Sequence, residues 1–339
     1  MRRWTRAVAV LSATGFAAAL AVTPAAADTV IANIPIIGQP WGMAMTSDGK
    51  HAYVASGYKG LVAVVDTVTN SVATTIDQDL GDPVAIALTP DGTRAYVASR
   101  SGGVSVIDTA TNTRLGGIGV GSTPSDIAIT PDGTRAFVTN SNTAAYGTVS
   151  VIDTVTNTVT NTFRVGKNPH KIAITPDGTR AYITNNNSGT VSAIDINTSA
   201  ITEIAVGSWP AGIAIAPNGS RAYVANNNSG TVSVIDTATN AVVNVIPGPP
   251  RPNAVAFTPD GSRAYVTDGA NLTISVIDTA TSTVATTYPM DSGPGAIVFT
   301  PDGTRAYVSL SISAEVAVIA IEKDLPNLPS TGSLGSLGS

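Results

Sequence analysis

The chain contains no cysteine, only two histidines and few charged residues, which make up 12% of its 339 positions. Without cysteine there is no disulfide, no thiolate metal site and no cysteine nucleophile. A charge content this low, combined with 43% hydrophobic residues, excludes a disordered chain and predicts a large core. The 32 glycines and 21 prolines, with Ser, Thr and Asn between short Val/Ile runs, predict many short strands, tight turns and almost no helix.

The first 27 residues have the composition of a signal peptide. Three arginines within the first six residues precede an apolar stretch over 7–22, and three alanines, ending at Ala27, supply a small-residue cleavage site. The apolar stretch is shorter than the ~20 residues that span a bilayer, which disfavours a retained anchor. We therefore expect secretion or surface display through the general secretory route. The mature chain would begin at Asp28 and have no transmembrane span.

Removal of the leader makes the protein more acidic. The mature chain would keep 15 lysines and arginines against 23 aspartates and glutamates, a net charge of about −8. No local basic cluster offsets this balance, and an acidic surface repels phosphate backbones and anionic headgroups. We therefore expect no nucleic-acid partner.

Residues 323–339 predict a flexible C-terminal tail, because they end in a Ser-Leu-Gly repeat and such segments behave as coils. Within them, Leu328 to Gly332 reads Leu-Pro-Ser-Thr-Gly and resembles the LPXTG signal that sortases cut to attach proteins to a cell wall. The apolar span and basic tail that normally follow this signal are absent. Wall anchoring and a chance match within a flexible tail both stay open.

A segment of the form Thr-Pro-Asp-Gly-Thr-Arg-Ala-Tyr-Val recurs along the chain. Its glycines are separated by 43, 41, 45, 41, 42 and 42 residues and are Gly49, Gly92, Gly133, Gly178, Gly219, Gly261 and Gly303. Units of this length have room for four short strands, and seven in-phase copies are typical of a closed ring of sheets. The sequence therefore predicts an all-β, seven-bladed β-propeller of four-stranded antiparallel blades over residues 28–322.

The third unit illustrates one blade, with strands expected over 126–129, 136–138, 149–152 and 159–165. Pro-Asp-Gly makes the first turn, because proline fixes φ and glycine accepts a positive φ. The inner strands are apolar on nearly every residue, which indicates that neighbouring blades cover both faces. An outer strand from Thr29 to Ile34 precedes the first unit, whereas the last unit lacks one. The N-terminal strand is therefore expected to complete the seventh blade and close the ring.

Three repeated positions are interpreted as scaffold. The aromatic residue of the second strand is phenylalanine in one unit, so packing between blades explains it better than chemistry. The basic residue at the start of that strand lies at the same end as an aspartate closing the third strand, so cross-strand pairing or Asx-turn bonding accounts for both. The seventh unit has Ala320 in place of the aspartate, which leaves Arg305 unpaired or paired from outside the repeat.

Four of the repeated segments carry a family resemblance. Residues 137–140 read Phe-Val-Thr-Asn, 182–185 Tyr-Ile-Thr-Asn, 223–226 Tyr-Val-Ala-Asn and 265–268 Tyr-Val-Thr-Asp, alongside repeated Val-Ile-Asp-Thr and Pro-Asp-Gly. Together they resemble the YVTN β-propeller repeats of exported bacterial proteins and archaeal surface-layer proteins, from Thr29 to Ile321. The resemblance implies a surface-exposed propeller, similar in fold to seven-bladed lactonases. It implies little about function, because one scaffold hosts many activities.

Function is expected where the repeat is broken, on the face that holds the loops entering each inner strand and the loops between second and third strands. In the entering loops a proline keeps its register while its neighbours vary, and two tryptophans flank it. A histidine with nearby lysines and an arginine could form a positive pocket for a carboxylate, a sugar acid or a peptide C-terminus. The candidate ligand-binding residues at this channel mouth are Trp41, Asp82, Asp126, Lys167, His170, Lys171, Trp209 and Arg251.

Purely structural alternatives stay open for these residues, since each tryptophan could fill a local gap and His170 could be a solvated surface residue. No catalytic residue, metal site or cofactor is assigned. His51 stands where other repeats have a scaffold residue, so a metal site would have one histidine and otherwise carboxylates. The Asn-rich loops at 185–189 and 226–230 lack the carboxylates that tight Ca²⁺ binding needs.

The leading hypothesis is a monomeric binding or interaction module outside the cytoplasm. Its partner would be a cell-wall or extracellular protein or glycan, or a small carboxylate-bearing ligand. One alternative is a lactonase- or lyase-like enzyme drawing on Asp82, Asp126, His170 and Arg251. Another is a purely structural surface-layer component.

Overall fold

The computed structural model describes residues 28–141 and 146–322. The predicted signal peptide and the C-terminal tail with its Leu328 to Gly332 motif lie outside the described residues. The described part of the chain forms 28 strands in seven four-stranded sheets, and no helix in it could cross a membrane. The predicted all-β, seven-bladed architecture is confirmed.

Six blades are built from consecutive strands, and the seventh combines the first strand with the last three. Blade 1 comprises β2 (Gln39–Met45), β3 (His51–Gly57), β4 (Leu61–Asp66) and β5 (Ser71–Ile76). Blade 2 comprises β6 (Pro83–Leu88), β7 (Arg94–Ser99), β8 (Gly103–Asp108) and β9 (Thr113–Ile118). Blade 3 comprises β10 (Pro124–Ile129), β11 (Arg135–Asn140), β12 (Gly147–Asp153) and β13 (Thr158–Val165). Blade 4 comprises β14 (Pro169–Ile174), β15 (Arg180–Asn185), β16 (Thr190–Asp195) and β17 (Ile201–Ala205). Blade 5 comprises β18 (Pro210–Ile215), β19 (Arg221–Asn226), β20 (Thr231–Asp236) and β21 (Ala241–Pro247). Blade 6 comprises β22 (Val255–Phe257), β23 (Arg263–Asp268), β24 (Thr273–Asp278) and β25 (Thr283–Pro289). Blade 7 comprises β26 (Pro294–Phe299), β27 (Arg305–Leu310), β28 (Glu315–Ala320) and β1 (Thr29–Pro35).

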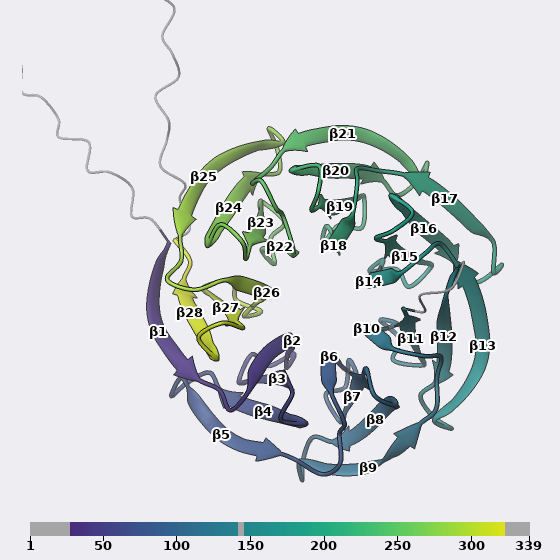
Figure 1. The fold of residues 1–339 in the computed structure, drawn as a ribbon, viewed down its shortest axis with the longest axis vertical. Helices are drawn as coiled ribbons and strands as arrows, with labels where there is room; N and C mark the ends of the chain where they lie inside the picture. The colour runs from purple at the N-terminus through teal and green to yellow at the C-terminus, as the bar shows by residue number, and fades with distance from the viewer. Residues whose placement is uncertain (1–27, 142–145, 323–339) are drawn as a thin grey trace, which may run out of the picture.

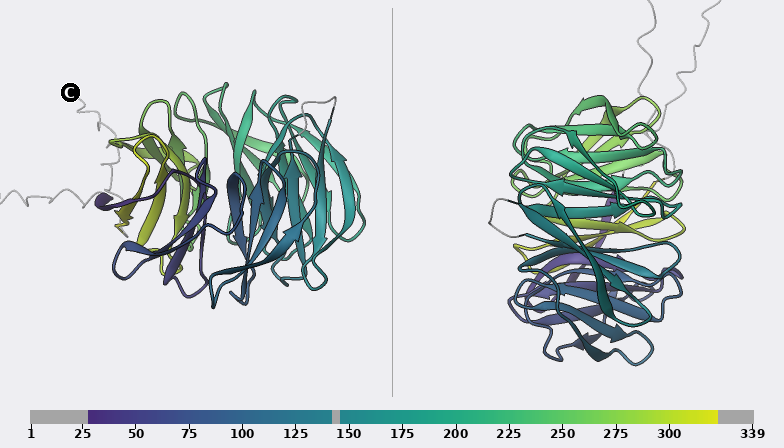
Figure 2. Two further views of the ribbon diagram at one scale, coloured as in Figure 1. Left: turned by 60° about the horizontal axis from the view of Figure 1, so that its bottom comes forward. Right: turned by 90° about the vertical axis from the view of Figure 1, so that its right-hand side faces the viewer.

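The blades stand radially around a central opening (Figure 1). The first strand of each unit lies nearest the centre, and the fourth forms the rim. Seen from the side, the ring is a thick disc with connecting loops on two opposite faces (Figure 2). We call the face with the Pro-Asp-Gly hairpins the turn face, and the face with the loops entering the inner strands the mouth face.

Burial follows position in the blade. In blade 3, β11 buries five of its six residues, whereas β10 buries two of six. The second strand is covered by a neighbouring blade on each side, while the first strand has residues turned toward the channel. The expectation of two covered faces therefore holds for the middle strands more fully than for the innermost one.

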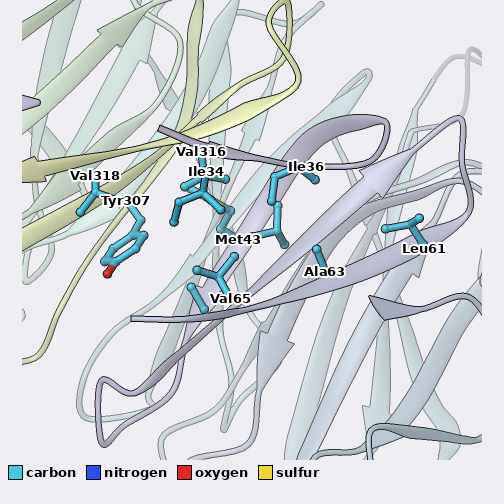
Figure 3. Close-up of a cluster of buried hydrophobic side chains, with 11 residues drawn as sticks. Ile34, Ile36, Met43, Leu61, Ala63, Val65, Tyr307, Val316 and Val318 are labelled. Atoms are coloured by element: carbon cyan, nitrogen blue, oxygen red, sulfur yellow. The ribbon is translucent and has the colours of Figure 1, made fainter. Parts of the chain in front are cut away.

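The ring closes as predicted, because β1 pairs antiparallel with β28, from Thr29 opposite Ala320 to Pro35 opposite Glu315. Ile34, 2% exposed, packs between Val316 of blade 7 and Met43 of blade 1 (Figure 3). The core therefore continues across the seam, and β28 has no unpaired edge.

Repeated tyrosines and arginines tie most blades to the next. Tyr96 Oη donates a hydrogen bond to Asn157 Oδ1 at 2.7 Å, and Arg94 Nη1 donates to the Thr154 carbonyl at 2.9 Å. Where Phe137 replaces tyrosine, the equivalent position of the facing turn holds Ser199 instead of asparagine. The tyrosine position therefore adds a hydrogen bond to the packing role that the sequence indicates.

The repeated aspartates serve mainly their own turns. Asp153 Oδ1 accepts the amides of Val155 and Thr156 at 3.0 and 2.8 Å, and the other five aspartates make comparable Asx-turn bonds. Cross-strand pairing is present between Arg221 and Asp236, whose Nη1 and Oδ2 lie 2.5 Å apart. Of the two explanations considered, Asx-turn bonding is the general one.

Blade 7 lacks the repeated aspartate, and Asp28, which directly precedes β1, takes its place. Tyr265 Oη donates to Asp28 Oδ2 at 2.5 Å, and the Glu322 amide donates to Asp28 Oδ1 at 2.9 Å. Arg305 donates to the Thr67 carbonyl of blade 1 at 2.5 Å, so its partner does come from outside its own unit.

Candidate functional site

A proline at the start of the inner strand sets the geometry of the mouth face. A register shift follows this proline in six of the seven inner strands. The residue after the proline lines a central cavity in six blades, and these residues are Trp41, Val84, Ser125, His170, Asn253 and Gly295. One repeated backbone feature therefore presents a different side chain from each blade to the same space.

The cavity has a volume of about 280 Å³ and is walled by residues from every blade except the fifth. Trp41, Val84, Pro294 and Ile312 make its apolar surface, while the polar groups include Arg100, His170, Lys171 and Asn253, with serines from blades 3 and 7. An apolar cavity with a few convergent polar groups is the usual form of a small-ligand site.

Two cations in the wall differ in their surroundings. Lys171 Nζ lies 3.2 Å from Asp126 Oδ1, and Asp126 Oδ2 accepts the Ile172 amide at 3.0 Å. Arg100 instead stacks on Trp41, with its guanidinium carbon 4.9 Å from the ring centroid. Among the described residues no carboxylate lies within ion-pairing distance of Arg100. The cavity therefore holds one neutralised cation and one available cation.

His170 is half-buried, and part of its surface borders the cavity. Burial, with a smaller contribution from the positive charge of Lys171, lowers its pKa to about 4. Its Nδ1 is 3.4 Å from the carbonyl of Ala211. His170 is thus neutral at neutral pH, and it supplies hydrogen-bonding capacity rather than positive charge.

The structure brings together four of the eight predicted site residues. Trp41, His170 and Lys171 line the cavity, and Asp126 lies against it as the partner of Lys171. The others lie away from the cavity wall. Asp82 accepts the amide of Tyr58, Lys167 and Arg251 are exposed, and Trp209 borders a separate groove.

Sequence reasoning missed Arg100, Asn253 and Ser309. Arg100 follows β7, in a loop position where other blades have serine, asparagine or glycine, so its charge was the available signal. Ser309 Oγ lies 3.2 Å from the Trp41 carbonyl across the seam, a contact that depends on ring closure and leaves no local pattern. Within residues 28–141 and 146–322, no three His, Asp or Glu side chains cluster as metal ligands would.

Comparison with known proteins supports the fold. No family model matches the chain, and no curated protein matches it. Among solved structures, a chain of hydrazine synthase from Kuenenia stuttgartiensis superposes with a TM-score of 0.76 at 23% identity, covering 85% of this chain and 97% of that one. At this identity the likeness establishes a shared propeller architecture and carries no activity across.

Proposed function

We propose that the protein is an exported binding module whose central cavity takes a small ligand with a carboxylate and an apolar body. The observation that carries this proposal is the Arg100 guanidinium, held on the Trp41 ring at the cavity wall without a carboxylate partner among the described residues. The β-propeller is a fold that commonly acts as an interaction module, and export rests on the leader-like first 27 residues.

The chemistry of the wall favours this ligand class. Lys171 is already neutralised by Asp126 and His170 is neutral, so the net charge offered to a ligand comes from Arg100. A guanidinium binds a carboxylate through two parallel hydrogen bonds, which are stronger than bonds between neutral groups. Trp41, Val84, Pro294 and Ile312 would cover the apolar part of the ligand.

Isothermal titration of the purified protein with phenylacetate, and with uncharged phenylacetamide as its counterpart, tests the proposal. Arg100→Gln should weaken phenylacetate binding about 10- to 100-fold, the value of one charge-assisted hydrogen-bonded contact. Arg251→Gln removes the same charge from an exposed site on the same face and should change affinity less than about twofold. Equal affinity for the acid and the amide, or equal losses in the two variants, would contradict it.

A lactonase-like hydrolase is the second candidate, and the observation that favours it is the neutral imidazole of His170 at the cavity. A neutral histidine can accept a proton from water in such a site. Asp126 is engaged by Lys171 and the Ile172 amide, so it would orient rather than attack. Turnover of a lactone that His170→Gln abolishes while the fold is retained would favour the enzyme over the binding module.

A further inference from the structure

A second concave surface on the mouth face lies between blades 4 and 5, outside the central cavity. This blade 4/5 groove is open, encloses about 710 Å³, and is lined by Asn186, Asn187, Ser188, Gly189, Val206, Gly207, Ser208 and Trp209. None of these side chains is charged. The groove therefore differs in chemistry from the cavity, whose wall contains the cations Arg100 and Lys171.

Trp209 is placed in the groove at a cost. It is 43% exposed and adopts a left-handed φ of 55°. This backbone region is uncommon for bulky residues and better tolerated by asparagine. The equivalent residues before the proline in blades 3 and 4 are Thr123 and Asn168, with φ of 49° and 53°. Neither core packing nor backbone preference explains a tryptophan here, and exposed strained residues of this kind mark binding sites.

Asn186 supplies the second feature. Its residue is 4% exposed, and its Oδ1 is buried without a hydrogen-bond partner. Leaving a buried polar atom unpaired is unfavourable, so a partner is expected.

A near-identical loop in the next blade shows the contrast. Residues 185–189 and 226–230 both read Asn-Asn-Asn-Ser-Gly. In the second copy, Asn227 Nδ2 donates to the Pro252 carbonyl at 3.2 Å, and the Asn227 oxygen is not left as a buried orphan. The first copy lines the groove together with Trp209. The second copy lies on the other side of Trp209, where the Asn227 amide donates to the Trp209 carbonyl at 2.9 Å and the Asn227 side chain reaches Pro252. The first asparagine of each loop, Asn185 and Asn226, has a buried unpaired Oδ1 in both copies, whereas the second asparagine has one only in the copy that lines the groove, at Asn186.

We propose that the blade 4/5 groove binds an uncharged saccharide unit of a glycan chain. The apolar C–H face of a sugar ring packs on an exposed aromatic ring, and sugar hydroxyls are donors that would satisfy Asn186 Oδ1. The exposed Asn187, Ser188 and Ser208 offer further polar groups to the ligand. An open groove suits a chain that continues past the site, and the absence of charge in the lining favours a neutral sugar over a sugar acid.

The test uses purified protein and neutral hexasaccharides of β-1,4-linked glucose, N-acetylglucosamine and mannose, measured by isothermal titration. Saturable binding of at least one is expected. Trp209→Asn should keep the thermal midpoint, because asparagine suits the left-handed backbone, yet weaken binding at least about tenfold. Asn186→Ala should also weaken binding, whereas the matched change Asn227→Ala in the twin loop should not.

Two further measurements separate this site from the cavity. Arg100→Gln should leave hexasaccharide affinity unchanged, and Trp209→Asn should leave phenylacetate affinity unchanged, so either site can fail alone. In a Trp41→Phe background, Trp209 is the remaining tryptophan of residues 28–339, and its emission should shift to the blue when a sugar covers it. The proposal is overturned if none of the sugars binds saturably, or if binding survives both Trp209→Asn and Asn186→Ala.

Discussion

The turn face and the mouth face are made by the same seven units, yet they treat polar side chains differently. On the turn face, Thr89 Oγ1 donates to Asp91 Oδ1 at 2.5 Å and the Thr93 amide donates to the same carboxylate at 3.0 Å, an arrangement that recurs around the ring. On the mouth face, Arg100 has no carboxylate partner among the described residues, and Trp41 Nε1 and Asn186 Oδ1 are buried without hydrogen-bond partners.

This difference separates scaffold from site. A side chain whose hydrogen bonds are consumed by its own turn has little left for a ligand, so repetition on the turn face holds the blades together. On the mouth face the repeated proline fixes the backbone and leaves the next side chain free to vary. A rigid frame with variable loops is the usual way in which binding residues are positioned.

The largest expected effect lies in the scaffold. Burial raises the pKa of the Tyr182 hydroxyl to about 12, so this group stays protonated and donates to Asn240 Oδ1 at 2.7 Å. Tyr182→Phe removes this donor and should lower the free energy of unfolding by about 1–3 kcal/mol, measured by urea denaturation. Tyr223→Phe is the control, because the equivalent turn position facing it is Ser282 and its hydroxyl makes no such bond. Equal losses in both variants would remove the inter-blade bond as the cause.

The next effect has the opposite sign and lies on the mouth face. Asp126→Asn keeps an oxygen for the Ile172 amide but releases Lys171 as a second cation in the cavity. Phenylacetate affinity should rise about tenfold, equivalent to about 1.4 kcal/mol, at low ionic strength. Asp82→Asn removes the same charge from a residue outside the cavity wall and should change affinity less than about twofold. Unchanged affinity in Asp126→Asn would count against a carboxylate beside Lys171.

Most of the fold could be predicted from the sequence, because each blade repeats its turn residues and its strand pattern locally. Closure by β1 was also readable, since an outer strand precedes the first unit and the last unit lacks one. The hydrogen-bond partner of Arg94 could not be predicted, because the carbonyl that it reaches lies sixty residues further along the chain, in the next blade.

The site was readable only in part. Trp41, His170 and Lys171 follow the repeated proline, and the structure brings them to one cavity. Trp209 precedes its proline instead of following it, and lies in the blade 4/5 groove. Whether a loop residue meets the channel or a neighbouring blade depends on that one-residue difference, which composition does not reveal. Contacts across the ring, such as that of Arg100 with Trp41, depend on how the blades are spaced.

The smallest expected effect is a pH dependence confined to the turn face. Hydrogen bonds, first from Thr300 and then from the Thr304 amide, lower the pKa of Asp302 to about 2, from 3.8. The carboxyl binds protons more weakly in the folded protein than in the unfolded chain. Its contribution to the free energy of unfolding is therefore complete above about pH 5 and is lost as the pH falls through 3.8 toward 2. Asp302→Asn should therefore narrow the difference in urea midpoint between neutral and acidic solution. Asn218→Asp restores the carboxylate that blade 5 lacks and should widen that difference. Both changes should be small since these side chains face water, and a shift of the same sign in both variants would show that the turn carboxylates do not govern it.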